Sequence, residues 1–430
     1  MPNAHKLTPR GIFAASSGNV LEWYDFTVYG FLAPIIGRVF FPQDDVLATT
    51  LSAFAVLAVG YLARPIGSVI FGHIGDRMGR KPALLISVIL MGFGSVAIGV
   101  MPTHEQIGMA AAVLLVAVRI VQGIAVAGEY TSSGILLVES APPRRRYLAG
   151  SWIAFAMMIG CVVGAAVPAI VSSQMSEEMM TSWGWRVPFL IGGVVALTSL
   201  ILRIGLNESA SLEESDTPPV VRAVREHWRE MISMIILMIP VAVLYFLVFT
   251  YASSFLTEQM HVSTATALDF STINLVTVAV LIVPAGYLAD AIGPRPVLLA
   301  AALITLVAVY PFWSMMHASD LTDVFVGQMG FAAINAAGWA LSITVLCAMV
   351  PMAIRCSAVS IGYNLCMAIF GGTTPFVATY LVSRTSDDFA PVYYLVAATL
   401  LSLIVIWRLP RKGAAWPGEA AGASSKAEAA

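Results

Sequence analysis

Two carboxylates in the first apolar stretch of the chain are the residues best placed to do chemistry. Glu22, Asp25 and Tyr29 are spaced so that one face of a helix carries all three. If that helix begins near Gly11, Glu22 lies about 16 Å and Asp25 about 21 Å along its axis. Arg119 lies about 18 Å into a later apolar segment that runs the opposite way. Acids and a guanidinium at one depth predict a buried network whose carboxyls can exchange a proton.

The protonation of such a carboxyl depends on two opposed effects, because desolvation favours its neutral form and a nearby arginine its charged form. A solute that arrives or leaves could tip this balance and so couple its own movement to that of a proton. We therefore predict a proton-coupling group of Asp25, Glu22, Arg119 and, ten residues further on, Glu129. The alternative is a fixed ion network that holds two helices together. Arg64, about two turns from the end of its span, is expected to reach toward the membrane surface and to serve mainly structure.

A ten-residue signature occurs twice, at Gly72–Lys81 and Gly286–Arg295, and its two aspartates lie half a chain length apart. Its glycines permit a sharp turn and close backbone approach, and its aspartate is suited to cap the N-terminus of a neighbouring helix. Its arginines can pair with acids at the end of another span. These features predict a gating latch, whose residues are Gly72, Asp76, Arg77, Gly79, Arg80, Glu139 and Asp290. The alternative is an ordinary basic loop.

The composition places these residues in a membrane protein. Hydrophobic residues make up 58% of the chain and charged residues 11%, against about 25% in soluble domains; the mean hydropathy is +0.84. Apolar stretches long enough to span a bilayer lie at roughly 11–40, 49–72, 83–101, 107–137, 147–174, 185–206, 231–257, 265–289, 296–316, 321–350, 355–384 and 389–408. With the repeat, they predict an all-α membrane protein of twelve transmembrane helices in two pseudo-symmetric six-helix bundles.

The spans divide the chain into an N-terminal bundle (1–206), a cytoplasmic linker (207–230), a C-terminal bundle (231–408) and a disordered tail (409–430). A short amphipathic helix is expected in the linker, around Val220–Trp228. Placing both termini in the cytoplasm puts all but five of the 23 basic residues on that side, as the positive-inside rule requires. The five exceptions are Arg38, Arg64, Arg119, Arg186 and Arg384. The acids inside the first span argue against a cleaved signal segment.

Several classes of function are disfavoured. No HExxH, GxSxG or cysteine–histidine pairing is present, so we expect no enzyme and no catalytic residues. The spacing of the four cysteines indicates neither disulfides nor a metal site, and no cofactor is expected. The net charge of −2 gives no indication of nucleic-acid binding. The expected partners are a small solute, protons and membrane lipid, and the protein is expected to be a monomer.

Several segments resemble a known family. Gly72–Lys81 and Arg119–Gly123 are similar to the loop and helix motifs of the major facilitator superfamily. A narrower set resembles its metabolite:proton symporter family, which includes citrate, α-ketoglutarate, shikimate and proline/betaine carriers. That set is Gly18–Phe26, Tyr61–Gly67, Gly128–Tyr130, Gly150–Trp152, Trp183–Phe189 and Tyr363–Gly372. The resemblance implies two bundles of six helices and proton-coupled uptake across a bacterial inner membrane.

The solute is expected to bind between the bundles near the membrane midplane. We predict that it is contacted by Arg119, Tyr29, Tyr24, Tyr251, Asn335, Trp339 and Asn364. A mono-, di- or tricarboxylate requires cations, for which Arg119 is the first choice and Arg64 a reserve. A zwitterion such as proline or betaine would use an aromatic cage instead. We place proton-coupled symport of an organic acid first and the zwitterion second; an uncoupled facilitator or a channel is a more distant alternative.

Overall fold

The computed structural model describes residues 9–41, 46–205, 217–252, 255–256, 260, 262 and 264–409. The spanning helices of the first half are α1 (Pro9–Phe31), α3 (Val46–Arg77), α4 (Arg80–Val100), α6 (Met109–Ser140), α7 (Arg146–Ser173) and α9 (Arg186–Ile204). Those of the second half are α11 (Trp228–Phe246), α13 (Thr264–Ile292), α14 (Pro294–Met316), α15 (Leu321–Ala348), α16 (Arg355–Cys366) with α17 (Thr374–Thr385), and α18 (Ala390–Arg408).

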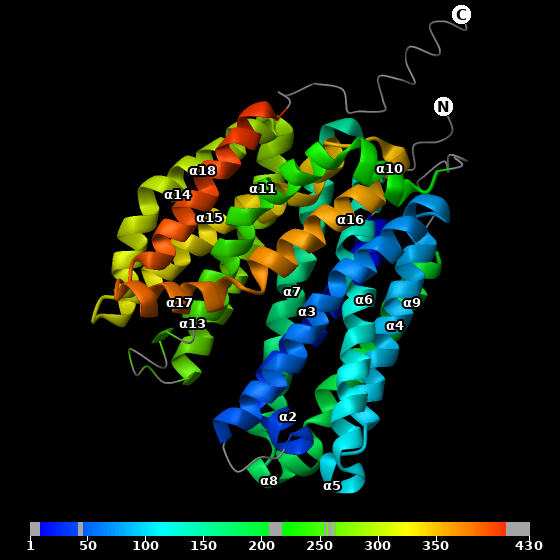
Figure 1. Ribbon diagram of the computed structural model, residues 1–430, viewed down its shortest axis with the longest axis vertical. Coiled ribbons are helices and arrows are strands. Elements are labelled where there is room, and N and C mark those ends of the chain that lie inside the picture. Colours follow the sequence, from blue (N-terminus) through cyan, green and yellow to red (C-terminus); the bar gives the residue numbers. More distant parts are fainter. Residues whose placement is uncertain are drawn as a thin grey trace, which may run out of the picture.

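These helices form two six-helix bundles, as predicted (Figure 1). Among the described residues, eleven segments are long and apolar enough to cross a membrane. The twelfth spanning helix is α1, whose composition is less apolar because it carries both Glu22 and Asp25. Large apolar side chains such as Leu62, Phe93 and Val307 remain exposed on the outside of the bundles, as expected for a surface that faces lipid.

Three of the predicted continuous spans are interrupted. The first ends at Phe31 and restarts as α2 (Ala33–Phe40), because Pro34 in the first turn of α2 cannot donate the hydrogen bond that would continue α1. In the second half, α11 passes into the π-helical segment η3 (Leu247–Tyr251), and α16 passes into η5 (Met367–Gly371) before α17 begins. Such π-helical turns inside α-helices often occur at functional sites.

The bundles contact each other mainly through two helix pairs, α3 with α16 and α7 with α13. Both pairs end where the duplicated aspartates lie, and this end of the molecule, which also carries α10 (Pro219–Glu226), is called here the latch end. At the far end, α2, α5 (His104–Ile107) and α8 (Glu177–Met179) pack on the first bundle and α17 on the second, and the bundles diverge in Figure 1.

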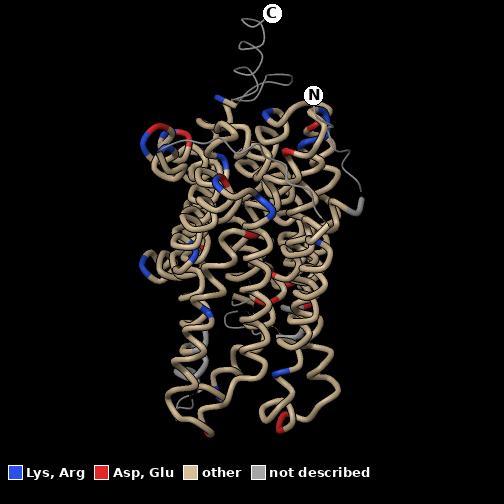
Figure 2. Tube along the Cα trace, turned by 90° about the vertical axis from the view of Figure 1, so that its right-hand side faces the viewer, with Lys and Arg blue, Asp and Glu red and all other residues tan. Residues whose placement is uncertain are grey.

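The helix α10 lies within the predicted linker and packs against α3, α11 and α16. Residues 207–216 of that linker, residue 206 before it, and residues 410–430 of the predicted tail lie outside the described residues. The domain boundaries therefore stay a prediction. In Figure 2, lysine and arginine gather at the latch end, whereas several acidic positions lie midway along the molecule.

One buried ion pair fastens the first bundle internally. Arg203 of α9 pairs with Glu129 of α6 through both guanidinium NH2 groups, one of them 2.8 Å from Glu129 Oε2. The same guanidinium donates to the carbonyl oxygens of Ala14 and Ala15 in α1. Ser87 of α4 donates to Glu129 as well, so four helices meet at this pair. Nearly every polar atom of the pair is bonded, which makes it a structural fastening.

We predict that Arg203→Leu destabilises the protein strongly, because it leaves the Glu129 carboxylate buried without a counter-charge. The expected loss in the free energy of unfolding is about 3–5 kcal/mol. The exposed pair Arg38–Glu177 is the matched control, and Arg38→Gln should cost no more than about 1 kcal/mol. Unfolding of the purified protein in detergent measures both, and equal losses would contradict the structural role.

Candidate functional site

An incompletely bonded ion pair lies at the centre of the molecule. Glu22 Oε1 of α1 is 3.8 Å from Arg64 Nη1 of α3, and both side chains are 1% exposed. Neither carboxylate oxygen of Glu22 accepts a hydrogen bond from the described residues, and Arg64 Nε and Nη2 donate none to them. Buried polar groups normally find partners, and those that do not often mark a site for water or a ligand.

This position corrects the expectation for Arg64. The span was predicted to end near residue 72, which placed Arg64 about two turns from the membrane surface. In the structure α3 continues to Arg77, so Arg64 lies about 20 Å from the helix end, using 1.5 Å per residue. Its guanidinium therefore cannot reach the surface. It lies instead 4.3 Å from the ring centre of Tyr61 and 4.7 Å from that of Phe26.

Asp25 and Arg119 are brought together, although through an intermediary. Ser95 of α4 donates to Asp25 Oδ1 at 2.8 Å, and Gln122 Nε2 donates to Asp25 Oδ2 at 3.3 Å. The amide oxygen of Gln122 accepts from Arg119 Nη1 at 2.9 Å, and Arg119 lies 3.9 Å from the ring centre of Tyr29. Asp25 thus has partners on both oxygens, in contrast with Glu22. Sequence reasoning missed Gln122, although its position three residues after Arg119 places both on one helix face.

Aromatic rings from both bundles meet beside these charges. Trp23 of α1 packs edge-on against Tyr245 of α11 at 6.0 Å, and Tyr245 packs against Trp339 of α15 at 5.7 Å. Tyr130 of α6 stacks on Tyr363 of α16 at 4.6 Å. The predicted contact residue Trp339 also packs edge-on against Tyr130, at 6.3 Å, and is therefore part of the interface between bundles. So is Asn364, which donates to the carbonyl oxygen of Ala127 in α6.

Four of the predicted residues lie away from this central group: Glu129, Tyr24, Tyr251 and Asn335. Glu129 belongs to the pair with Arg203 and not to the Asp25 cluster. Tyr24 points to α9, where its hydroxyl donates to the Pro188 carbonyl oxygen. Tyr251 stacks on Trp313 of α14. Counting along the chain gives the height of a residue on its helix but not the rotation of that helix about its axis, which decides its neighbours.

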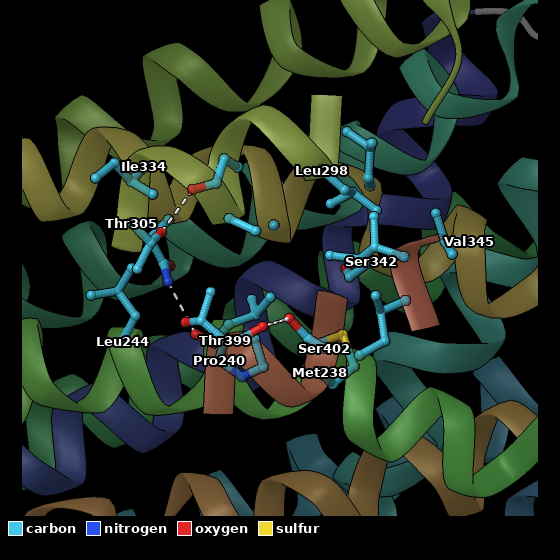
Figure 3. A pocket seen from close by; sticks show the side chains of 18 residues that line it. Met238, Pro240, Leu244, Leu298, Thr305, Ile334, Ser342, Val345, Thr399 and Ser402 are labelled. Carbon is cyan, nitrogen blue, oxygen red and sulfur yellow. Dashed lines mark hydrogen bonds between the residues drawn. The ribbon is translucent and has the colours of Figure 1, made fainter. Parts of the chain in front are cut away.

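Asn335 lines an apolar cavity inside the second bundle, between α11, α14, α15 and α18 (Figure 3). Its amide donates to the Val241 carbonyl oxygen. The hydroxyls of Thr305, Thr399 and Ser402 in the same cavity donate to carbonyl oxygens of their own helices. The cavity holds no charged side chain among its lining residues, so it is a poor site for an ionic solute.

The first copy of the duplicated signature joins the two bundles. Both oxygens of Asp76 accept from backbone N–H groups in the first turn of α16, Cys356 at 2.9 Å and Ser357 at 2.8 Å. Such a carboxylate satisfies N–H groups that the helix itself cannot, and it complements the helix dipole. A Cβ atom at Gly72 would lie 2.8 Å from Ser357 Cα, so the close approach of α3 to α16 requires glycine. Gly79 follows with φ +107°.

The second copy repeats this geometry with the bundles exchanged. Asp290 of α13 accepts from the N–H groups of Tyr147 and Leu148 in the first turn of α7. The first copy also adds an ionic cluster, in which Glu139 accepts from Arg80 and, at 2.8 Å, from Arg355 of the other bundle. The residue that corresponds to Arg80 in the second copy is Pro294. The predicted latch residues Arg80, Glu139, Asp76 and Asp290 thus all lie at the interface; Arg77 ends α3 beside them.

Comparison with known proteins agrees with this architecture. Residues 11–213 match the family model described as "Sugar (and other) transporter", and residues 245–428 match that of the Major Facilitator Superfamily. A proline/betaine transporter of Salmonella typhimurium is 33% identical over 414 residues, which are 92% of this chain and 82% of the relative. The chain belongs to the major facilitator superfamily. A glycine betaine/proline/ectoine/pipecolic acid transporter of Dickeya dadantii is 32% identical over 410 residues, which are 92% of this chain and 82% of that relative.

Solved structures share the fold. The proton:xylose symporter XylE bound to 6-bromo-6-deoxy-D-glucose has a TM-score of 0.79 at 18% identity, with 94% of this chain and 96% of the other covered. An inward-open form of XylE from E. coli has a TM-score of 0.64 at 18% identity, with 94% and 97% covered. At these identities the likeness establishes the twelve-helix fold of the superfamily and no more.

We predict that the two aspartate caps differ in strength. Asp76→Ala removes a helix cap, worth about 1 kcal/mol, and the ion pair with Arg80 as well, whereas Asp290→Ala removes a cap and a longer-range attraction to Arg145. Spin labels at the exposed residues Met78 and Met352 on either side of the latch should report opening as a longer distance. The open population should grow more for Asp76→Ala. A larger effect of Asp290→Ala would contradict the ranking.

Proposed function

We propose that this transporter imports a small zwitterionic solute, of the proline or betaine type, together with a proton. The observation that carries the proposal is the central Glu22–Arg64 pair, whose polar atoms are incompletely bonded and which lies beside Trp23, a ring that contacts Tyr245 of the second bundle. The same centre holds Asp25 and Arg119, so two acids balance two guanidinium groups. A zwitterion adds no net charge to this balance.

The balance also revises the order of the two solute classes. The sequence placed an organic acid first, because Arg119 and Arg64 could hold carboxylates. In the structure Arg64 already has Glu22 beside it, and Arg119 is linked to Asp25 through the side chain of Gln122. A di- or tricarboxylate would therefore leave uncompensated negative charge in an apolar interior. The names of the relatives, proline/betaine transporters, support the same order.

The proposed roles follow from the bonding of each group. Asp25 is proposed to carry the proton, since its loss or gain of charge is transmitted through Gln122 to Arg119. The solute is proposed to contact Glu22, Arg64 and the rings of Trp23, Tyr245 and Trp339. Cation–π attraction of about 0.5–2 kcal/mol per ring would favour a quaternary or secondary ammonium. Glu129, Tyr24, Tyr251 and Asn335 are not included.

The transport cycle is proposed to be a rocking of the bundles about this centre. The two aspartate caps close the latch end, and the bundles diverge at the far end. With the latch end in the cytoplasm, this arrangement is an outward-facing state. The excess of basic residues at the latch end supports that orientation, with both termini inside a bacterial inner membrane. We propose a monomer that acts in lipid without a cofactor and without catalysis.

The test is uptake of labelled proline, glycine betaine and citrate by proteoliposomes with a pH gradient, acid outside. We expect uphill accumulation of at least one zwitterion and none of citrate. Accumulation of citrate alone would overturn the proposed solute class. Uptake that saturates but never exceeds equilibration would indicate an uncoupled facilitator.

Asp25→Asn should remove the response to the pH gradient, because an amide cannot release a proton. We expect its net uptake to fall to the equilibration level, while exchange of internal for external solute continues. Glu105→Gln, at an exposed acid near the far end, is the control and should accumulate solute as the wild type does. Undiminished uphill accumulation by Asp25→Asn would show that the proton binds elsewhere.

A further inference from the structure

We propose that the solute binds alongside the Glu22–Arg64 pair, antiparallel to it. Its cationic nitrogen lies against the Glu22 carboxylate and its carboxylate against the free N–H groups of Arg64. The pair then selects zwitterions whose two charges are separated by one carbon atom. This inference rests on the proposed function and adds to it the spacing of charges that the site recognises.

The first support is the unfinished bonding of the pair. One contact of 3.8 Å joins Glu22 Oε1 to Arg64 Nη1. Both oxygens of the acid, and Nε and Nη2 of the arginine, have no hydrogen-bond partner in the described part of the chain. Buried ions are stable only when such atoms are also bonded. A second, oppositely directed charge pair would supply both missing contacts and create a square of alternating charges.

The second support is a contrast within the same bundle. The Glu129–Arg203 pair is equally buried, yet its guanidinium donates to carbonyl oxygens of α1 and α4 as well as to the acid. The chain therefore completes a buried pair where the role is structural. At the central pair, whose neighbour Trp23 contacts the other bundle, the remaining bonds are left to another partner.

The third support is how Arg64 is held. Rings of Phe26, Tyr61 and Trp23 lie 4.7, 4.3 and 5.9 Å from its guanidinium carbon. Rings at the guanidinium face fix its position but accept no strong hydrogen bond, so its N–H edge stays available. Trp23 also contacts Tyr245 of the second bundle, and its indole N–H has no partner among the described residues. It can therefore donate to the solute carboxylate.

The fourth support is dimensional. With standard bond lengths, the nitrogen and the carboxylate oxygens of a zwitterion whose two charged groups are joined by one carbon lie about 3–4 Å apart. This matches the 3.8 Å between the charged atoms of the resident pair. A longer spacer would place one charge beyond its partner, and a solute with a single charge would satisfy only half of the pair.

The experiment measures binding to the purified full-length protein in lipid nanodiscs by calorimetry, with four probes. Glycine betaine has both charges one carbon apart, and γ-butyrobetaine has a longer spacer. Choline lacks the carboxylate, and tert-butylacetate replaces the charged nitrogen of glycine betaine by carbon. We expect the wild type to bind glycine betaine at least about tenfold more tightly than each of the other three, a factor that one good polar contact supplies.

Two variants assign the two ends of the solute. Glu22→Gln should abolish the preference for glycine betaine over tert-butylacetate, and Arg64→Gln should abolish its preference over choline. If a single variant fails to fold, Glu22→Gln with Arg64→Gln keeps the volumes without an unpaired charge and should lose both preferences. Glu105→Gln removes a charge from an exposed acid far from the pair, and its preferences should equal those of the wild type.

The failures can be told apart. If the wild type prefers glycine betaine but Glu22→Gln and the double variant keep that preference, this inference is wrong while the proposed function stands. Equal affinity of the wild type for glycine betaine and γ-butyrobetaine also overturns the selected spacing. If the wild type does not bind glycine betaine and imports neither it nor proline in the uptake test, the proposed function and this inference fall together.

Discussion

The structure depends on one constraint, that charges inside an apolar bundle must be balanced and bonded. Helix α1 contributes two acids to the centre, α3 and α6 contribute one arginine each, and the positions of these three helices follow from that pairing. One acid, Asp25, is bonded on both oxygens through Ser95 and Gln122. The other, Glu22, is not. We interpret this difference as a division between a site that holds a proton and a site that holds a solute.

The two bundles contribute differently to that centre. The first supplies the charged groups, and the second faces them with the rings of Tyr245, Trp339 and Tyr363. The latch shows a similar inequality, because Asp76 and Asp290 cap helices in the same way but only the first copy carries the cluster of Arg80, Glu139 and Arg355. A duplicated chain has thus retained the capping geometry of both copies, while the cluster of three charged side chains stands beside the first.

Much of this could be predicted from the sequence where one helix or one repeat determined the answer. Apolar length and duplication predicted the bundles, and helix rise predicted the shared depth of Glu22, Asp25 and Arg119. Depth alone could not predict which groups face each other. Arg64 was misplaced because α3 runs beyond its apolar stretch to Arg77, and Glu129 was misassigned because its partner, Arg203, lies on a helix distant in sequence. Rotation of helices about their axes is set by packing between them, and the pattern of a single helix does not contain it.

The central claim is that a site without net charge accepts a zwitterion together with one proton. The most direct test is to measure the charge that moves in each transport event. A zwitterion and a proton together carry one positive charge inward, so an inside-negative potential alone should drive uptake; 100 mV contributes about 2.3 kcal/mol. We predict an inward current in proteoliposomes on a solid support when glycine betaine is added without a pH gradient, with one charge per solute. Electroneutral uptake, unaffected by the potential, would contradict the account.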